Sequence, residues 1–408
     1  MNTRFHIAVP DNPARLDFVG TSPRSSAVPL VSAAREFFHP TTFTWWMYCV
    51  LVLAGSIGAS TGIALFDTRV TLMRLLPLFV ITLGLFALLI LVFDPYRARR
   101  FWVMLLAAMA GASIPTWLSM IANGYWAGVV TAVLPDGSGP QWWAAVAGPT
   151  SEEWSKAMCV FLIMVIAGAS LRRPMHGLFT GAFVGLGFQI LENISYASNA
   201  ALTDINSDVN DALTITVLRS VIGISSHWLY SGVVGAGVAV ALGRTVTDVP
   251  LWKRLGGFCG FYLLGWGLHF VWNAPAGDSV LTLLLIPVKM IASLVVFGLV
   301  LRWCFNQERL FLVEAMDEVA AAGTGHPDLS RLSADQQMRT VVAGTRRQRR
   351  TTLSRIRFSD GPEAKKDAKK SRLVLLEALQ AWGRRGTGVD ELAGASVPPQ
   401  LRHTAQLR

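Results

Sequence analysis

Several long apolar runs of this sequence contain ionisable residues, which restricts the folds that the chain can adopt. The run 143–169 is long enough to cross a bilayer, yet Glu152, Glu153 and Lys156 lie near its middle. Later apolar runs carry three more such groups, namely Glu192, His227 and His269. An ionisable group near the bilayer centre costs at least about 2.5–3.5 kcal/mol on insertion scales. Because four separate runs accept this cost, the sequence predicts one shared site inside a membrane.

The composition supports a membrane protein. The chain has 408 residues, of which 52% are hydrophobic and 15% are charged, whereas a soluble domain carries about 25% charged residues. The four cysteines are scattered, and no pair has zinc-ligand spacing, so we expect no disulfide framework. We therefore expect an all-α, polytopic bundle in the cell membrane.

Apolar runs that meet the requirement of roughly 20 residues define eight expected spans. They cover residues 43–66, 71–93, 101–121, 143–169, 175–197, 212–242, 255–274 and 280–303. The expected organisation is a cytosolic lead over 1–42, a membrane domain over 43–303 with its motifs in 143–274, and a basic tail over 304–408.

The basic residues of the loops predict the orientation. Arginine and lysine follow the second, fourth and sixth spans, whereas the loops 122–142, 198–211 and 275–279 contain neither. The positive-inside rule therefore places both termini in the cytoplasm.

The tail over 304–408 holds 18 of the 36 Lys and Arg residues, against 12 acids. We expect it to be partly disordered, with weak helical stretches, and to be attracted to anionic lipid. The stretch 370–385 forms an amphipathic basic helix that could lie on the membrane or bind a cytosolic partner. The tail has no feature of a nucleic-acid-binding module.

The pair Glu152 and Glu153 is the strongest candidate site. Lys156 lies three and four residues further on and shares a helix face with both. Internal neutralisation by Lys156 would explain one carboxylate but leaves the other to be protonated, metal-bound or functional.

The span 175–197 carries glycines at steps of four, and the same stripe continues to Glu192 and Tyr196, with Asn193 beside it. Small residues at this spacing allow close helix packing, which would turn the stripe toward the bundle interior. Glu192 is then either functional or a neutral, hydrogen-bonded acid.

The remaining candidates are His227, His269 and Asn273, the last two being four residues apart on one helix face. Neutral imidazole suits both a metal ligand and a hydrogen-bond donor to an oxyanion. Arg219 and Lys289 are weaker candidates, interpreted as counter-charges. With 1.5 Å of rise per residue, Glu192 and His269 lie about 8 Å below the outer boundary, Glu152 about 14 Å and His227 about 15–22 Å, so side chains about 5 Å long could meet there.

Together these residues resemble the PrsW family of intramembrane endopeptidases. Four motifs carry the resemblance, in order on four consecutive spans within about residues 100–303: Glu152-Glu153-Trp154-Ser155-Lys156, Gly185 to Tyr196, His227, and His269-Phe270-Val271-Trp272-Asn273. Gln189 stands where the family often has a small residue.

The resemblance implies hydrolysis of a peptide bond in a membrane protein near the extracytoplasmic side, with an anti-sigma factor or a similar signalling protein as substrate. It implies the catalytic set Glu152, Glu153, Glu192, His227, His269 and Asn273, supported by Lys156, Asn193 and Tyr196. The more distant similarity to CAAX prenyl endopeptidases implies a metal-free scheme, in which Glu152 activates water while the histidines and Asn273 hold the oxyanion. A zinc ion held by Glu192, His227 and His269 is the alternative, and the residues leave both open.

Two other classes of protein compete with a protease. A proton- or ion-coupled transporter would also place Glu, His and Lys inside the membrane, but it should show an internal repeat, and the two halves of the membrane domain share no charge pattern. A catalytically inactive protease-like scaffold is the other, and the intact motifs count against it. The expected partners are membrane lipids and a membrane-protein substrate.

Overall fold

The computed structural model describes residues 37–134, 137–203, 208–275, 280–321 and 327–382. The regular elements of these residues are all helices, and no strand occurs among them. In chain order they are α2 (Phe43–Gly62), α3 (Arg69–Val92), α4 (Phe101–Val133), α5 (Gly139–Ile166), α6 (Pro174–Thr203), α7 (Asp208–Ile222), the 3₁₀ turn η2 (Gly223–Ser225), α8 (His227–Ala241), α9 (Leu251–Asn273), α10 (Val280–Ala321), α11 (Pro327–Ala334), α12 (Gln336–Ala343) and α13 (Arg346–Trp382).

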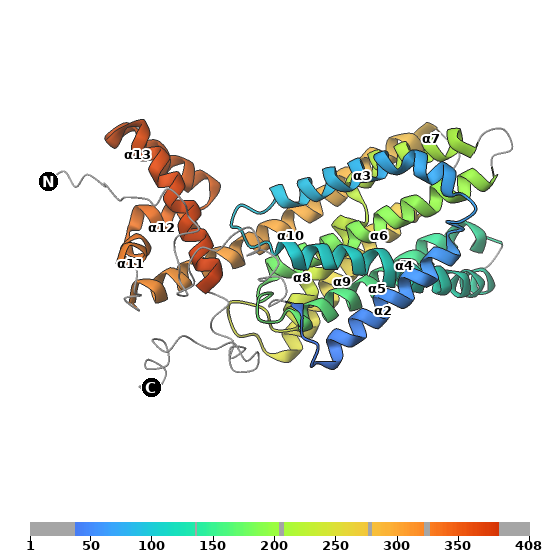
Figure 1. The fold of residues 1–408 in the computed structure, drawn as a ribbon, viewed down its shortest axis with the longest axis horizontal. Helices are drawn as coiled ribbons and strands as arrows, with labels where there is room; N and C mark the ends of the chain where they lie inside the picture. Colours follow the sequence, from blue (N-terminus) through green and yellow to red (C-terminus); the bar gives the residue numbers. More distant parts are fainter. Residues whose placement is uncertain (1–36, 135–136, 204–207, 276–279, 322–326, 383–408) are drawn as a thin grey trace. The chain divides into compact units, whose positions relative to one another are not determined.

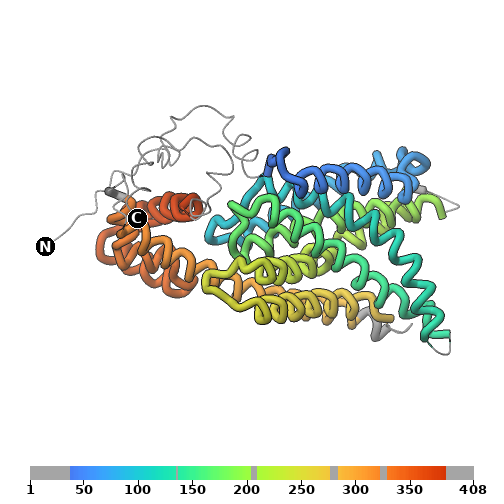
Figure 2. Tube along the Cα trace, turned by 90° about the horizontal axis from the view of Figure 1, so that it is seen from below, coloured from blue at the N-terminus to red at the C-terminus, as the bar shows by residue number. Residues whose placement is uncertain are grey.

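The chain divides into two compact units. The membrane unit comprises the described residues of Ala33–Asp94 and Arg99–Phe305, and the tail unit those of Asn306–Arg408 together with Pro95–Ala98. In Figures 1 and 2 the helices of the membrane unit run roughly parallel or antiparallel to one another. Large apolar side chains such as Leu53, Leu85 and Leu299 are exposed on this bundle, as expected of a surface that faces lipid.

Seven helical segments among the described residues are long and apolar enough to span a membrane, which confirms a polytopic helical bundle. The fourth expected span, α5, has 28 residues but is not among these seven segments, because it carries too many charged residues. Glu152, Glu153 and Lys156 lie so near its middle that every stretch of 18 residues within α5 contains all three. The helix excluded by its charge is therefore the one that carries the strongest motif.

The structure changes several of the expected boundaries, among them that of α10, which continues to Ala321 instead of ending at residue 303. Helix α4 continues to Val133 instead of ending at residue 121, because hydropathy falls there while helical hydrogen bonding does not. The span expected as one helix over 212–242 is interrupted by η2 and by Ser226, whose φ and ψ of −122° and −137° are not helical. His227 is consequently the first residue of α8.

Gln189 of α6 holds this interruption in place. Its Nε2 donates to the carbonyl oxygen of Gly223 at 3.2 Å, and its Oε1 accepts from Ser226 Oγ at 2.9 Å. Trp228 Nε1 donates to the same Gly223 oxygen at 3.2 Å. Backbone groups released inside a membrane need such partners, since no bulk water is present to hydrate them.

The central helix α6 packs closely on α8 through the glycines predicted from its sequence. A Cβ atom at Gly181 or Gly185 would overlap the carbonyl oxygen of Ser231 or His227. On another face of α6, a Cβ atom at Gly187 would overlap the carbonyl oxygen of Ala108 in α4. The expected small-residue seam is confirmed and brings α8 against the helix that carries Glu192, while Gly187 allows α4 to approach another face of that helix.

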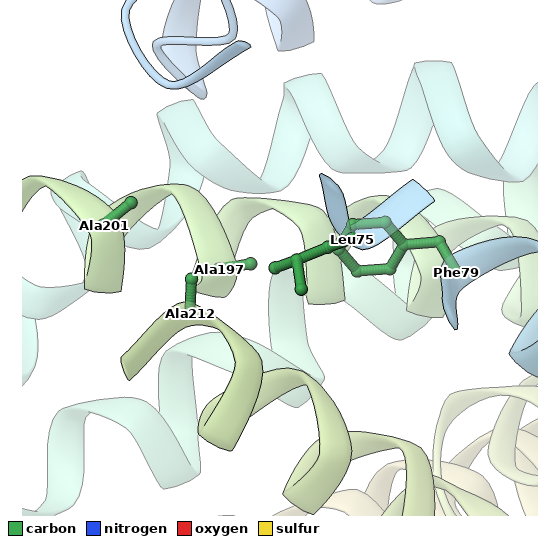
Figure 3. Packing of buried hydrophobic residues seen from close by; sticks show 5 residues of the cluster. All are labelled: Leu75, Phe79, Ala197, Ala201 and Ala212. Carbon is green, nitrogen blue, oxygen red and sulfur yellow. The ribbon is translucent and has the colours of Figure 1, made fainter. Parts of the chain in front are cut away.

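The outer flank of α6 is covered by α3 and α7. Figure 3 shows the apolar cluster where the three helices meet, formed by Leu75, Phe79, Ala197, Ala201 and Ala212. The alanines let α7 approach α6 closely, and this contact positions the last turn of α7, which carries Arg219.

The tail unit has a small apolar core of its own. Val341 of α12 packs against Leu353 and Ile356 of α13, and α13 is kinked at Gly361, whose φ is 92°. In the stretch predicted as an amphipathic helix, Leu375, Leu376 and Leu379 are buried, so much of its apolar face is used within the protein. Residues 383–408 and 1–36 lie outside the described residues.

Candidate active site

The predicted site residues converge inside the membrane unit from four helices. Helix α5 supplies Glu152, Glu153 and Lys156, α6 supplies Glu192, and α8 and α9 supply one histidine each. Apart from Glu192, whose side chain is 19% exposed, these residues are buried. Such a concentration of buried ionisable groups is stable only when the groups pair with one another.

Lys156 lies at the centre of the cluster. Its Nζ is 2.9 Å from Glu153 Oε1, 3.3 Å from Glu152 Oε2 and 3.0 Å from His227 Nδ1. The ammonium also lies 3.8 Å from the centroid of the Phe188 ring. Lys156 therefore pairs with both α5 carboxylates, on the helix face that the spacing predicted, and it also contacts a histidine on α8.

His269 is oriented by Glu153. Its Nδ1 lies 3.1 Å from Glu153 Oε1, and Ser231 Oγ donates to Glu153 Oε2 at 3.2 Å. Because an ionised carboxylate only accepts hydrogen bonds, Nδ1 of His269 carries the proton, and neutral His269 presents a lone pair at Nε2. That Nε2 lies 3.9 Å from Glu152 Oε2, a separation that one bridging water can fill.

His227 uses both ring nitrogens. An ammonium has no acceptor, so Nδ1 of His227 accepts from Lys156 and the proton resides on Nε2. Nε2 lies 2.8 Å from Glu192 Oε2 and donates a hydrogen bond to it. His227 thus links the α5 carboxylates to Glu192.

Arg219 of α7 holds Glu192 from the other side. Its guanidinium pairs with the Glu192 carboxylate, and its Nε donates to Asn193 Oδ1 at 2.8 Å. The same guanidinium lies 3.9 Å from the centroid of the Tyr196 ring. Asn193 and Tyr196, predicted as supporting residues, contact Arg219, and Arg219 is a counter-charge as expected.

The charges of this cluster do not cancel. Three carboxylates face two cations, Lys156 and Arg219, so neutral imidazoles leave one negative charge in excess. An unbalanced buried charge is unfavourable, and a proton, a cation or a reacting group can relieve it. The excess lies next to Glu152, which shares Lys156 with Glu153.

A cavity of about 210 Å³ opens onto the cluster. Its walls include Glu152, His269 and Asn273, and Asn273 Nδ2 donates to the Ala144 carbonyl oxygen at 3.1 Å. A Cβ atom at Gly148 would lie 3.0 Å from Asn273 Nδ2 and 3.8 Å from His269 Nε2. The missing side chain at Gly148 therefore keeps open the space between these groups.

One set of donors fits a metal ion. Glu152, His227 and His269 are buried and each offers a ligand atom within 4.8 Å of the others. The set anticipated from the sequence had Glu192 in place of Glu152, and in the structure Glu192 bonds to His227 and Arg219. Two imidazoles and one carboxylate, with Glu153 behind one imidazole, form a donor set that suits zinc.

Several residues of the site were not found by sequence reasoning. Asn123 of α4 donates to Glu152 Oε1 at 3.5 Å and accepts from Ser151, yet it fell in a segment expected to be a loop. Ser231 and Gly148 are also absent from the predicted site residues. The signal for Asn123 was a polar residue just beyond an apolar run, which hydropathy alone assigns to a loop.

A polytopic helical protein with a buried cluster of carboxylates and histidines beside a cavity has the construction of an intramembrane enzyme. Residues 99–301 match the family model described as PrsW family intramembrane metalloprotease. The chain belongs to this family and is a peptidase. No curated protein matches the chain, and neither does any solved structure.

Proposed function

We propose that this protein is an intramembrane endopeptidase that hydrolyses a peptide bond of a membrane protein at the buried cavity, with Glu152 as the base. The observation that carries the proposal is the separation of 3.9 Å between Glu152 Oε2 and His269 Nε2 on the wall of that cavity. The two groups can hold one water molecule, and peptide hydrolysis requires a water, a base and a stabilised oxyanion.

In the proposed reaction the water donates one hydrogen bond to Glu152 and one to His269 Nε2. Glu152 takes a proton as the water oxygen attacks the carbonyl carbon of the scissile bond, and a tetrahedral oxyanion forms. When the C–N bond breaks, the proton held by Glu152 passes to the leaving amine. Glu153 keeps His269 in the tautomer whose Nε2 can accept.

The structure supports a change in the roles of the histidines from those expected. In its neutral form His269 accepts at Nε2, and both nitrogens of His227 are engaged, so we assign the oxyanion contact to Asn273. The Nδ2 of Asn273 has a second hydrogen beyond the one donated to Ala144. The N-terminus of α8, which begins at His227 on the cavity wall, adds a favourable dipole.

The donor set also fits a divalent cation. Glu152, His227 and His269 would hold it, and such a cation supplies a bound water of lowered pKa and a polarised carbonyl group. Glu153 would then orient the ligand His269 through the same hydrogen bond that it makes in the structure.

The substrate class follows from the place of the site. A cavity between membrane helices can admit a segment of another membrane protein. We propose that the substrate is a single-span protein, such as an anti-sigma factor, cut near its extracytoplasmic end. The loops without Lys and Arg support cleavage on the extracytoplasmic side. In this arrangement the protein lies in the cell membrane with both termini in the cytoplasm.

The test uses the full-length protein, reconstituted in vesicles with candidate single-span proteins. We expect specific cleavage by the wild type, none by Glu152→Gln, and full cleavage by Glu314→Gln, a matched change at an exposed acid of α10. Equal cleavage by wild type and Glu152→Gln would refute the assignment of the base. Proton- or ion-driven flux without cleavage would instead support the transporter.

A further inference from the structure

A second cluster of charge, outside the proposed active site, lies at the opposite ends of the same helices. It comprises Arg172 in the link between α5 and α6, Arg244 in the link between α8 and α9, and Arg254 in the first turn of α9. All three belong to the membrane unit, at the side that the positive-inside rule assigns to the cytoplasm.

The backbone of Arg244 is held firmly. Gly243 has a φ of 69°, and its N–H donates to the Val240 carbonyl oxygen at 2.9 Å while the N–H of Arg244 donates to that of Ala239 at 2.8 Å. This pair of bonds closes the C-terminus of α8 in the manner of a Schellman turn. The direction in which the Arg244 side chain leaves the helix is therefore determined by the turn.

The Arg244 side chain runs across the end of α5. A Cβ atom at Gly168 would lie 3.1 Å from Arg244 Nη2, so the absence of a side chain at Gly168 leaves room for the guanidinium. The Nε of Arg244 is buried and has no hydrogen-bond partner among the described residues. By contrast, Arg254 uses its Nε and Nη2 to cap α8, donating to Ala241 O at 3.1 and 2.7 Å.

The electrostatic surroundings of Arg244 are cationic. Burial lowers the pKa of its guanidinium, and the charges of Arg172 and Arg254 lower it further. Within the described residues none of the three arginines forms an ion pair, and Asp248, an acid of the same link, is exposed and pairs with none of them. Three guanidinium groups without a carboxylate repel one another, and an anion with several acceptor oxygens would turn that repulsion into attraction.

We propose that Arg172, Arg244 and Arg254 form an anion site that binds a phosphate group at the cytoplasmic boundary of the membrane. The planar guanidinium offers paired donors that match phosphate oxygens, and Arg244 brings donors that the fold leaves unused. The phosphate is either that of an anionic lipid headgroup or free phosphate. The site lies apart from the proposed active site and does not depend on its chemistry.

The experiment measures thermal unfolding of the full-length, detergent-solubilised protein with phosphatidylglycerol, phosphatidylcholine or inorganic phosphate. We expect phosphatidylglycerol to raise the unfolding temperature of the wild type more than phosphatidylcholine does. Stabilisation by inorganic phosphate of the same size would identify free phosphate as the ligand. A wild type stabilised by neither anion would overturn the proposal.

Variants locate the site. Arg172→Gln and Arg244→Gln should each weaken the apparent affinity for the stabilising anion about tenfold, since each removes charge-assisted hydrogen bonds. Arg74→Gln, the same change at an exposed arginine of α3, should leave it unchanged. Gly168→Ala keeps every charge but fills the space that Arg244 Nη2 needs, and it should also weaken binding. Undiminished affinity in Arg244→Gln and Gly168→Ala would place the anion elsewhere and refute the site.

Discussion

Glu153 Oε1 lies 3.1 Å from His269 Nδ1, which joins a carboxylate of α5 to an imidazole of α9. The same oxygen is 2.9 Å from Lys156 Nζ, so Glu153 is fully engaged, whereas Glu152 shares Lys156 at 3.3 Å and faces the cavity. Two neighbouring acids in one motif therefore have different surroundings. In the proposed reaction Glu153 therefore orients His269, and Glu152 is available to take a proton from water.

This difference predicts separate phenotypes for the two carboxylates. Glu152→Gln should lower cleavage by about 10²–10⁴ or more, because an amide cannot take a proton from water, with little change in thermal unfolding. Glu153→Gln should lower both cleavage and the unfolding temperature, since it leaves Lys156 and His269 short of a charged partner. Cleavage and unfolding assays on both variants check this. Normal cleavage by either variant would indicate that the mutated carboxylate only neutralises Lys156.

Gly148 provides a test of the cavity. Gly148→Ala would place a methyl group 3.0 Å from Asn273 Nδ2 and 3.5 Å from Glu152 Oε1, in the space assigned to water and the scissile carbonyl. We expect at least about a tenfold loss of cleavage at unchanged or higher stability, because alanine is favoured over glycine in a helix by roughly 1 kcal/mol. Gly260→Ala is the matched control, since its Cβ atom in α9 would meet nothing within 4 Å. The two variants cleaving equally well would exclude the proposed water position.

The sequence predicted the membrane bundle and most of the site for the same reason. Because charge inside an apolar run is costly, Glu152, Glu153 and Lys156 could be recognised from the sequence as site residues. The same argument identified His227 and His269. Hydropathy, however, carries no information about backbone hydrogen bonding. The run through Gly223 and Ser226 is apolar enough to be expected as one helix, and the break became visible only through the bonds of Gln189.

Contacts that depend on helix rotation also escaped prediction. Asn123 reaches Glu152 because α4 continues beyond its apolar stretch, and Ser231 reaches Glu153 because the glycine seam draws α8 against α6. Neither distance can be read from spacing within one helix. Pairs within α5 could be predicted, whereas pairs between helices required the packing.

Gln189 should act as a positioning residue through the helix break. Gln189→Ala removes the donor to Gly223 O and the acceptor of Ser226 Oγ, each worth about 1 kcal/mol or more when buried. Because His227 starts α8 immediately after the break, we expect kcat to fall about tenfold with a smaller change in KM. Ser226→Ala removes one of the two bonds and should give an intermediate kcat. Wild-type kcat in Gln189→Ala would show that Trp228 holds the break alone.

The orientation can be checked without the substrate. Reporter fusions at residues 205 and 330 should report opposite sides of the membrane, the first extracytoplasmic and the second cytoplasmic, because the arginine-rich loops alternate with loops free of Lys and Arg. If both fusions reported the same side, the expected topology would be wrong, and cleavage could no longer be assigned to the extracytoplasmic side.

The last prediction concerns the metal. Lys156 Nζ already contacts two of the three fitting ligands, at 3.3 Å from Glu152 Oε2 and 3.0 Å from His227 Nδ1, and a divalent cation between them would face this ammonium. We therefore expect cleavage to persist in chelator-treated protein whose zinc content, measured by mass spectrometry, is far below one ion per chain. Lys156→Gln removes the competing charge and should take up more zinc than the wild type, a readout that does not require activity. If EDTA or phenanthroline abolished cleavage and added zinc restored it, Glu152, His227 and His269 would be metal ligands and the metal-free scheme would be wrong.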